Sequence, residues 1–310
     1  TTEIYTLSLH DALPISIPYL VLGVGTGVYG ILVGAGGGVI LAPALMIFFG
    51  VEPTVAAGTS LALVSINSVS GTVAYKRRGL VDIRSGWVFA LSAVPGSIIA
   101  PMVLDSASTT LFKILFGFLL LLLALIILLR PQYREDESVS DSSESDQEFD
   151  TINRVPSWLD FTLTDRNIVT RRGNTYKYRF TESLSAFFNL LLGFISSFFG
   201  TGGGFLRTPI LVSVFGFPVH VAVATSIFSL SIYATVGALV HVYLGHVDWY
   251  PALVWSGLGL IIGGQIGARL VEVIKGVIIL RILLVVVMIM GIQLILQGAW
   301  PSTFTFTGTY

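Results

Sequence analysis

Apolar segments of helical length alternate with short polar turns along most of the chain, and they form two sets of five. The first set is 17–33, 37–50, 54–75, 85–104 and 111–130, and the second is 184–199, 203–216, 220–243, 250–270 and 277–297. The third, fourth and fifth segments of each set can cross a bilayer, which takes roughly 20 apolar residues. The second segments are shorter, because fourteen helical residues rise only about 21 Å against an apolar core of about 30 Å. The pattern predicts an all-α polytopic membrane protein whose sets each begin with a broken or re-entrant helix.

The two sets are copies of one unit. Residues 34–82 align without a gap with residues 200–248, 166 positions later, and eighteen of the forty-nine aligned pairs are identical. Each copy contains a Gly-x-Gly-Gly-Gly run with a proline five residues further on. An apolar chain built twice from one unit, with a glycine-rich break in each copy, is typical of secondary transporters.

Basic residues lie in different loops of the two copies. The loop after the third segment is basic only in the first copy, and the loop after the fourth segment is strongly basic only in the second. The residues are Lys76, Arg77, Arg78 and Arg84 in the first of these loops, and Arg269, Lys275 and Arg281 in the second, where the first copy has Lys113 alone. Because Lys and Arg concentrate in cytoplasmic loops, the pattern predicts inverted five-segment repeats. Both termini are then outside the plasma membrane and the central linker is in the cytoplasm.

Composition supports a multi-pass membrane protein and removes some kinds of chemistry. Hydrophobic residues make up 54% of the chain and charged residues 11%, whereas soluble domains carry about 25% charged residues. The chain has no cysteine, which excludes disulfides, thiolate metal sites and cysteine nucleophiles. The net charge of −1 says nothing about partners, because the apolar mass contributes almost none of it.

The chain divides into five parts on this pattern: 1–16, a first transmembrane repeat at 17–130, a linker at 131–183, a second repeat at 184–297 and a short external tail at 298–310. Residues 1–16 lack the regions of a signal peptide and resemble translated sequencing-adapter DNA, so we set them aside. Within the linker, residues 135–150 are acidic and serine-rich, which predicts disorder. Residues 161–180 alternate and contain Arg172-Gly173-Asn174, which predicts a small cytoplasmic hairpin.

The glycine runs are the first candidate binding elements, at Gly36, Gly37 and Gly38 and at Gly202, Gly203 and Gly204. They do not fit a nucleotide-binding loop, because neither follows a strand or contains Gly-Lys-Ser/Thr. Close helix packing by small residues is one interpretation. The other interpretation is that the runs both pack helices and contact a ligand. A break leaves free N–H groups at the start of the second segment, and that positive helix end favours an anion.

Hydroxyl side chains recur within the third segments, as Thr59 and Ser60 and as Thr225 and Ser226. Such hydroxyls often bond to their own helix, but their presence at equivalent positions of both copies favours a substrate-binding role. Asn67 in the first copy aligns with a tyrosine in the second, so a site lined by both would be only pseudo-symmetric.

Arg207 is a charge inside an apolar segment, and its first-copy equivalent is Leu41. An intramembrane charge indicates function by default, and the planar guanidinium suits oxyanions. The alternative is a side chain that extends to the membrane interface.

The remaining polar residues suggest less chemistry. Asp82 and Asp248 follow the third segments in a Gly-x-Val-Asp pattern that predicts helix N-caps. His241 and His246 could titrate near the outer face, but nothing else in the sequence marks them as a proton relay. We find no metal-ligand spacing and no nucleophile–base set, so neither a cofactor, a metal nor enzymatic activity is expected.

These motifs together resemble the sulfite exporter TauE/SafE family. The resemblance covers about residues 18–130 and 184–297, and rests on the glycine run with its proline, the Ala-x-x-Thr-Ser run, the Gly-x-Val-Asp turn and their doubling. It implies a transporter of sulfite, sulfonates or related organosulfur anions, often an exporter. The long acidic linker departs from the family pattern, as does Arg207, which stands where many members are apolar.

The repeats predict a secondary transporter of a small anion that works by alternating access between two rocking halves, and the resemblance implies that it exports a sulfur-containing anion. The alternatives are a passive anion channel and a membrane subunit that acts through its cytoplasmic linker. The expected partners are the small anion, the lipid bilayer and a second copy in a homodimer, and nucleic acid is not expected.

Overall fold

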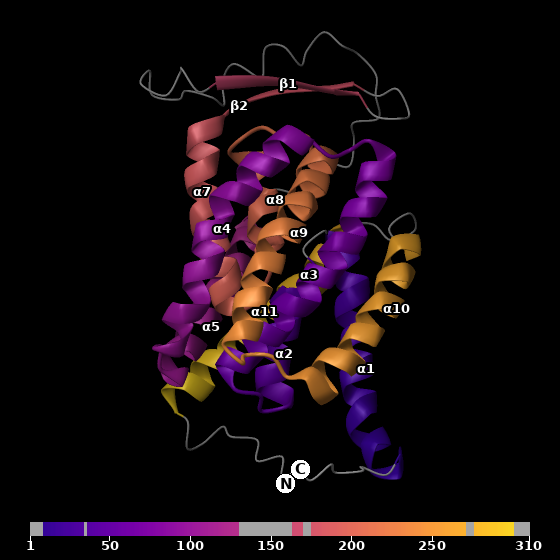
Figure 1. Ribbon diagram of the computed structural model, residues 1–310, viewed down its shortest axis with the longest axis vertical. Helices are drawn as coiled ribbons and strands as arrows, with labels where there is room; N and C mark the ends of the chain where they lie inside the picture. Colours follow the sequence, from indigo (N-terminus) through magenta and orange to yellow (C-terminus); the bar gives the residue numbers. More distant parts are fainter. Residues whose placement is uncertain (1–8, 34–35, 130–162, 170–174, 271–275, 301–310) are drawn as a thin grey trace.

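The computed structural model describes residues 9–33, 36–129, 163–169, 175–270 and 276–300, most of them in helices (Figure 1). The helices of the first copy are α1 (Leu9–Val33), α2 (Gly38–Phe48), α3 (Pro53–Arg78), α4 (Ile83–Asp105) and α5 (Thr109–Leu129). A hairpin of β1 (Leu163–Val169) and β2 (Thr175–Thr181) follows. The second copy contains α7 (Glu182–Phe199), α8 (Gly204–Ser213), α9 (Val219–Tyr243), a π-helical turn η2 (Trp249–Leu253), α10 (Val254–Leu270) and α11 (Gly276–Ala299).

Helices lie at all ten predicted segments, and the two short second segments are the short helices α2 and α8. Of the described helices, α4, most of α5, α7 and α9 are long and apolar enough to cross a membrane. α1 already begins at Leu9, within the stretch 1–16 that the sequence analysis set aside. Residues 135–150 of the acidic linker lie outside the described residues, as does most of the tail 298–310.

The most extensive helix contacts join one copy to the other. α1 packs with α10 and α4 with α7, so the first helix of each copy lies against the fourth helix of the other, while α3 pairs with α9 and α5 with α11. Glycines allow the close approach, because a Cβ at Gly27 would lie 2.5 Å from the carbonyl oxygen of Leu260, and one at Gly193 would collide with the carbonyl of Ala93. The molecule therefore has one interleaved core rather than two separate halves.

The predicted hairpin in the linker is confirmed. β1 and β2 pair antiparallel, with Leu163 opposite Thr181, and lie across one end of the helix bundle, which we call the hairpin end (Figure 1). Tyr178 and Phe180 pack against Phe217, in the turn between α8 and α9, and Phe180 also contacts Phe89 of α4. The hairpin thus contacts helices of both copies.

Asp82 is the polar centre of this docking. Its carboxylate accepts the backbone N–H of Ser85 at 3.1 Å, which confirms the predicted N-cap of α4. The same carboxylate accepts the Tyr178 hydroxyl at 2.6 Å and lies 3.6 Å from Nε of Arg166. Asp248, at the equivalent position, is the N-cap residue of η2, and its carboxylate interacts with the backbone N–H groups of Tyr250 and Ala252 rather than forming the bond that Asp82 makes.

Candidate functional site

The glycine breaks of the two copies meet at the centre of the bundle. The first break, at Gly36 and Gly37, and the second, at Gly200–Gly203, contain glycines with positive φ, including 75° at Gly36 and 79° at Gly202. A Cβ at Gly36 would lie 2.9 Å from Cγ1 of Val64, and a Cβ at Gly202 would lie 2.5 Å from the same atom. Both would also lie within 3.5 Å of the side chain of Leu230, the equivalent of Val64 in the second copy. The breaks therefore converge on one pair of side chains between α3 and α9.

Side chains of α3 and α9 hold the carbonyl groups of these breaks. Asn67 Nδ2 donates to the carbonyl of Gly36 at 3.3 Å, and its equivalent Tyr233 donates from Oη to the carbonyl of Gly202 at 2.5 Å. Ser60 Oγ donates to the carbonyl of Gly200 at 2.8 Å. The predicted residues Ser60 and Asn67 therefore lie at the breaks and help to set their shape.

Two more predicted residues, Thr59 and Thr225, bind backbone of the opposite copy. Thr59 Oγ1 accepts the N–H of Asp248, and Thr225 Oγ1 accepts the N–H of Asp82. Their oxygens are thus engaged at the two turns that follow the third helices. The hydroxyl of Ser226, in contrast, is buried and has no hydrogen-bond partner.

Arg207 is fully buried, with 0% of its surface exposed, and does not extend to the surface. It lies on α8 one turn after the second break, whose Gly203 N-caps the helix. Its Nη1 donates to Ser229 Oγ at 2.6 Å, and its guanidinium carbon lies 4.5 Å from the ring centroid of Tyr233. Nε and Nη2 have no hydrogen-bond partner, and no described carboxylate forms an ion pair with Arg207. A buried cation thus lies beside the second break without a counter-charge.

Buried hydroxyl groups belong to the same break and to the helices around it. A Cβ at Gly203 would lie 3.0 Å from Cβ of Ser196 and 3.1 Å from Oη of Tyr233, so these groups adjoin the break. We call the following residues the Arg207 cluster: Ser196, Thr201, Arg207, Thr208, Ser226, Ser229 and Tyr233. The hydroxyls of Thr201, Thr208 and Ser226 are buried and form no hydrogen bond with a described residue, whereas Ser196 interacts with the hydroxyl of Tyr233.

Arg207 and several of the hydroxyl residues of the Arg207 cluster have no polar equivalent in the first copy. Counting back 166 positions, Ser196 corresponds to Gly30, Arg207 to Leu41 and Ser229 to Leu63. The sequence analysis did not select Ser196, Thr201, Thr208 or Ser229 as site residues. A comparison of the two copies could have found them, because each is polar where the aligned residue of the first copy is apolar or glycine.

A second polar group, also missed from the sequence, lies at the opposite end from the hairpin. His246 Nε2 lies 2.6 Å from Oδ1 of Asp105, the last residue of α4. His246 Nδ1 lies 3.1 Å from Nδ1 of His241, whose Nε2 lies 3.0 Å from the carbonyl oxygen of Ser197. The two histidines that seemed isolated in the sequence are therefore linked to a carboxylate.

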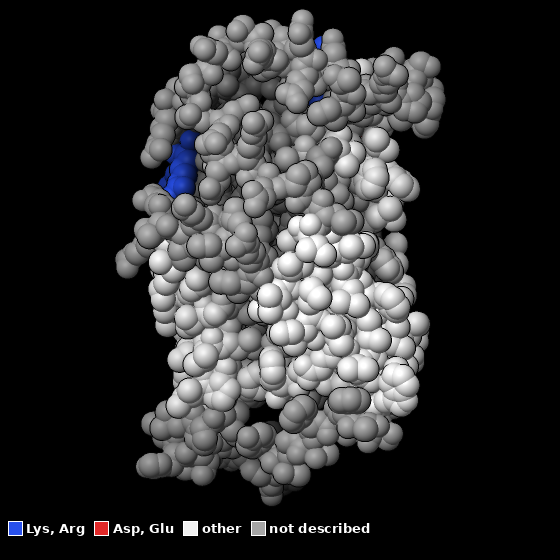
Figure 2. All heavy atoms as spheres, turned by 180° about the vertical axis from the view of Figure 1, so that it is seen from behind, with Lys and Arg blue, Asp and Glu red and all other residues white. Residues whose placement is uncertain are grey.

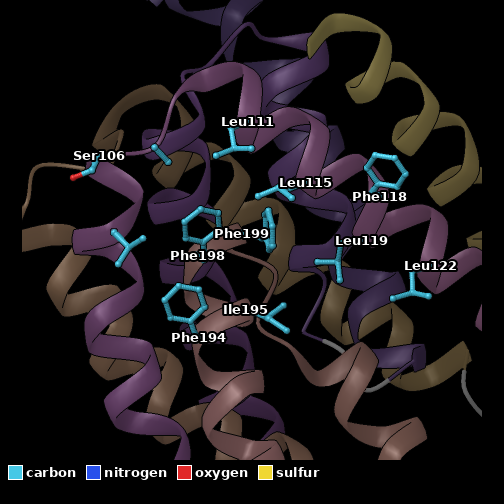
Figure 3. A pocket seen from close by; sticks show the side chains of 12 residues that line it. Ser106, Leu111, Leu115, Phe118, Leu119, Leu122, Phe194, Ile195, Phe198 and Phe199 are labelled. Carbon is cyan, nitrogen blue, oxygen red and sulfur yellow. The ribbon is translucent and has the colours of Figure 1, made fainter. Parts of the chain in front are cut away.

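A pocket of about 810 Å³ lies between α4, α5 and α7. Figure 3 shows Phe194, Phe198 and Phe199 of α7 facing Leu111 and Leu115 of α5. Its lining contains no charged side chain, and an anion buried there would have no partner for its charge. The lining of this pocket therefore does not suit an anion.

A helical membrane protein made of two related copies, with glycine-broken helices that meet at its centre, is built like a membrane transporter. The chain belongs to the sulfite exporter TauE/SafE family, whose family model matches residues 19–294. It is accordingly a membrane transporter and not an enzyme.

Individual relatives support this assignment. The chain is 32% identical to the probable membrane transporter protein YunE of Bacillus subtilis (strain 168), over 90% of this chain and 97% of the relative. It is 30% identical to the probable membrane transporter protein ORF9 of a Sinorhizobium species, over 87% and 88% of the two chains. A probable membrane transporter protein of Haemophilus influenzae is 24% identical over 86% of this chain and 90% of its own length. No solved structure matches the chain.

Proposed function

We propose that this protein is a secondary transporter that exports a small sulfur-containing anion, such as sulfite or a sulfonate, by alternating access. The observation that carries the proposal is the fully buried Arg207, which has two unpartnered nitrogens and no carboxylate partner among the described residues. The family to which the chain belongs is described as sulfite exporters, which supports the choice of a sulfur oxyanion.

The charge of Arg207 favours an anion as the missing partner. Removing an ion from water costs several kcal/mol even after the protein relaxes, unless an opposite charge and hydrogen bonds offset the cost. One hydrogen bond to Ser229 and the face of Tyr233 compensate only part of the cost. A sulfite or sulfonate oxygen pair matches the two free guanidinium nitrogens, because the planar fork binds oxyanions through parallel hydrogen bonds.

The rest of the proposed site comes from the breaks and the hydroxyls beside them. The N–H of Gly36 donates to the carbonyl of Gly30, so it is not available to an anion. Gly37 and Gly38, and Gly202–Gly204, lie at the N-termini of α2 and α8, and a helix N-terminus favours an anion. Ser226 offers a free hydroxyl, while Ser60, Asn67 and Tyr233 fix the break carbonyls. Thr59 and Thr225 contribute by anchoring the turns at either end. In this arrangement the substrate binds where the two copies meet.

We also propose that the copies are inverted repeats arranged around one central site. The reciprocal packing of α1 with α10 and of α4 with α7 supports a two-fold relation. α8 lies in the half of the molecule nearer the hairpin and α2 in the opposite half (Figure 1), so the short helices approach the centre from different ends. Rocking of helix pairs that each combine both copies would then open the central site to each side in turn.

The hairpin end is the cytoplasmic side in this proposal. Lys76, Arg77 and Arg78 form the last turn of α3, next to the turn that binds Tyr178. On the face in Figure 2 the blue Lys and Arg side chains lie toward the hairpin end, and the band of described residues below carries neither blue nor red. Basic residues at one end agree with the positive-inside rule.

Reconstitution of the purified full-length protein in liposomes tests the function. The expected result is saturable uptake of radiolabelled sulfite with counterflow, in which unlabelled sulfite inside accelerates entry of the label. A current that rises linearly with voltage, without counterflow, would instead identify a passive anion channel. Absence of flux for sulfite and for a panel of sulfonates would reject the proposed substrate class.

A further inference from the structure

Asp105, His246, His241 and Ser197 form a continuous line of polar contacts from the surface to the interior. The Asp105 side chain is 48% exposed and that of His246 8%, and His241 is fully buried. Asp105 ends α4, His246 lies in the turn after α9, His241 lies in the last turn of α9, and Ser197 lies in the last turn of α7 before the second break. The line therefore joins three helices and reaches the backbone beside Gly200.

Hydrogen-bond chemistry fixes how many protons this line holds. The Ser197 carbonyl can only accept, so His241 Nε2 carries a hydrogen and donates to it. A neutral His241 then has a bare Nδ1, and the 3.1 Å contact requires His246 Nδ1 to donate. With that hydrogen on Nδ1, the 2.6 Å contact between His246 Nε2 and Asp105 Oδ1 needs a further proton. This proton lies either on Nε2 of His246 or on the carboxyl group of Asp105. The geometry thus contains one proton more than two neutral imidazoles and a carboxylate.

We propose that Asp105, His246 and His241 form a proton-binding relay that links proton uptake at the outer surface to anion movement at the Arg207 cluster. This inference rests on the proposed function, because it assigns the coupling ion for that transport. The proton enters at the exposed carboxylate and is shared between Asp105 and His246. Histidine is suited to this role because its ordinary pKa lies near neutrality.

Loss of the proton must break a contact in the line. If the hydrogen of His246 moves to Nε2 to face a charged Asp105, the Nδ1 atoms of both histidines become bare and repel. His241 can restore that contact only by moving its own hydrogen to Nδ1, which removes the donor from the Ser197 carbonyl. Deprotonation at the surface therefore changes a hydrogen bond on the last turn of α7.

Serine hydroxyls continue the line to the proposed anion site. Ser197 Oγ donates to the carbonyl of Ser97 at 2.9 Å, and Ser97 Oγ donates to the carbonyl of Tyr233 at 2.7 Å. The space between these serines is closed, because a Cβ at Gly237 would collide with both hydroxyls. Since the Tyr233 ring lies against Arg207, a shift at Ser197 is transmitted to the residue that faces the anion.

The two histidines of the relay belong to the second copy, like Arg207, whereas Asp105 belongs to the first. The first-copy equivalents of His241 and His246 are Tyr75 and Leu80, which cannot relay a proton near neutral pH. The charge that binds the anion and the two histidines are therefore additions to the same half of a duplicated unit, and the histidines meet a carboxylate of the other half.

No other charged group among the described residues lies where it could control the protonation of His241 and His246. His246 and Asp105 are the charged or titratable groups that act on His241, and among the described residues Glu52 and Asp248 form no ion pair with either histidine. The remaining charged residues on the described helices that pack against α9 are Lys76, Arg77, Arg78, Arg84, Glu182 and Arg207. Of these, Arg207 lies at the second break and the rest at the hairpin ends of their helices.

The proton site can be tested without any substrate. Histidine nitrogens of the ¹⁵N-labelled full-length protein in detergent micelles are titrated by NMR, and the chain has only four histidines to assign. We expect the nitrogen signals of His246 and His241 to respond differently to pH in Asp105→Asn and in the wild type, because the variant lacks the carboxylate that shares the proton with His246. His220→Gln, at an exposed position on α9, serves as the control and should leave both signals unchanged. Identical titration of His246 in the wild type and Asp105→Asn would overturn the relay.

Coupling is tested by sulfite flux in proteoliposomes between pH 5.5 and 8, in the wild type and in His241→Gln, His246→Gln and His220→Gln. Sulfite itself titrates in this range, so differences between variants isolate the contribution of the protein. We expect His241→Gln and His246→Gln to lose the protein-dependent change in flux with pH, and His220→Gln to keep it. Unchanged profiles in both relay variants would overturn the coupling. A wild type without sulfite flux but with linked histidine titrations would instead reject the proposed substrate and keep the proton site.

Discussion

Thr59 accepts a hydrogen bond from the backbone N–H of Asp248, with 2.9 Å between Oγ1 and N, although the residues are 189 positions apart. Thr225 and Asp82, at the equivalent positions of the other copy, form the same bond at 3.1 Å. Each threonine near the start of a third helix thus holds the turn after the third helix of the opposite copy. Such reciprocity is what two surfaces related by a two-fold axis produce, and it supports the proposed relation between the copies.

Removing either threonine hydroxyl should destabilise the protein. Thr225→Val leaves the backbone N–H of Asp82 buried without an acceptor, which costs about 1–3 kcal/mol. Thr59→Val should cost less, because its bond to Asp248 is only partly buried. Thermal unfolding in detergent measures both, and Thr→Ser at each position is the control that keeps the oxygen. Equal stability of Thr225→Val and the wild type would show that this bond contributes nothing.

Arg207→Leu should separate stability from transport. Leucine is the residue that the first copy carries at the equivalent position, and replacing a buried unpaired charge by an apolar side chain is often neutral or stabilising by about 1–4 kcal/mol. We therefore expect an unfolding temperature at or above that of the wild type, together with loss of sulfite flux by at least about tenfold, the equivalent of 1.4 kcal/mol in binding.

Two controls support the Arg207→Leu experiment. Arg207→Lys keeps the charge but loses the planar fork, so it should retain part of the flux with weaker sulfite affinity. Leu41→Met changes the first-copy equivalent with little change in volume and should leave flux intact. Wild-type flux in Arg207→Leu would remove this residue from the site.

Much of this fold follows from the sequence because bilayer and duplication constrain it strongly. The apolar segments predict the helices to within a few residues in most cases, and alternation with Arg172-Gly173-Asn174 predicts the hairpin. The contacts of Asp105 with His246 could not be predicted, because they join the end of α4 to a turn of the other copy. Asp82 shows the same limit: its N-cap role is local and predictable, while its bond to Tyr178 depends on how the linker docks.

Tyr233→Phe tests the bond that shapes the second break. The variant keeps the aromatic face beneath Arg207 but leaves the carbonyl of Gly202 without its 2.5 Å hydrogen bond. We expect a loss of stability of about 1 kcal/mol and a reduced sulfite affinity, because the free N–H groups of the break lose their fixed direction. Asn67→Leu removes the equivalent bond in the first copy and is the matched comparison. Since Arg207 stands beside the second break only, Tyr233→Phe should affect sulfite affinity more than Asn67→Leu.

Alkaline pH should weaken docking of the hairpin. Burial, and the hydrogen bond to Asp82, raise the pKa of Tyr178 well above its ordinary value of 10.0. Because the folded-state pKa is the higher one, this stabilisation is complete below pH 10 and decreases as the pH rises above it. The unfolding temperature of the wild type should therefore fall between pH 8 and 10.5 by more than that of Tyr178→Phe. Tyr243→Phe, whose side chain is 86% exposed, is the control and should follow the wild type.

The convergence of both glycine breaks on Val64 predicts a specific rescue. Gly202→Ala places a Cβ 2.5 Å from Cγ1 of Val64 and also forces a side chain onto a residue with φ of 79°, which costs of order 1–3 kcal/mol. Val64→Ala removes the clash but not the backbone strain, so the double variant should recover only part of the stability that Gly202→Ala loses. Gly36→Ala should show the same partial rescue, since its Cβ would meet the same atom at 2.9 Å. Thermal unfolding of the single and double variants provides the measurement, and strictly additive losses in both cycles would mean that the breaks do not share Val64.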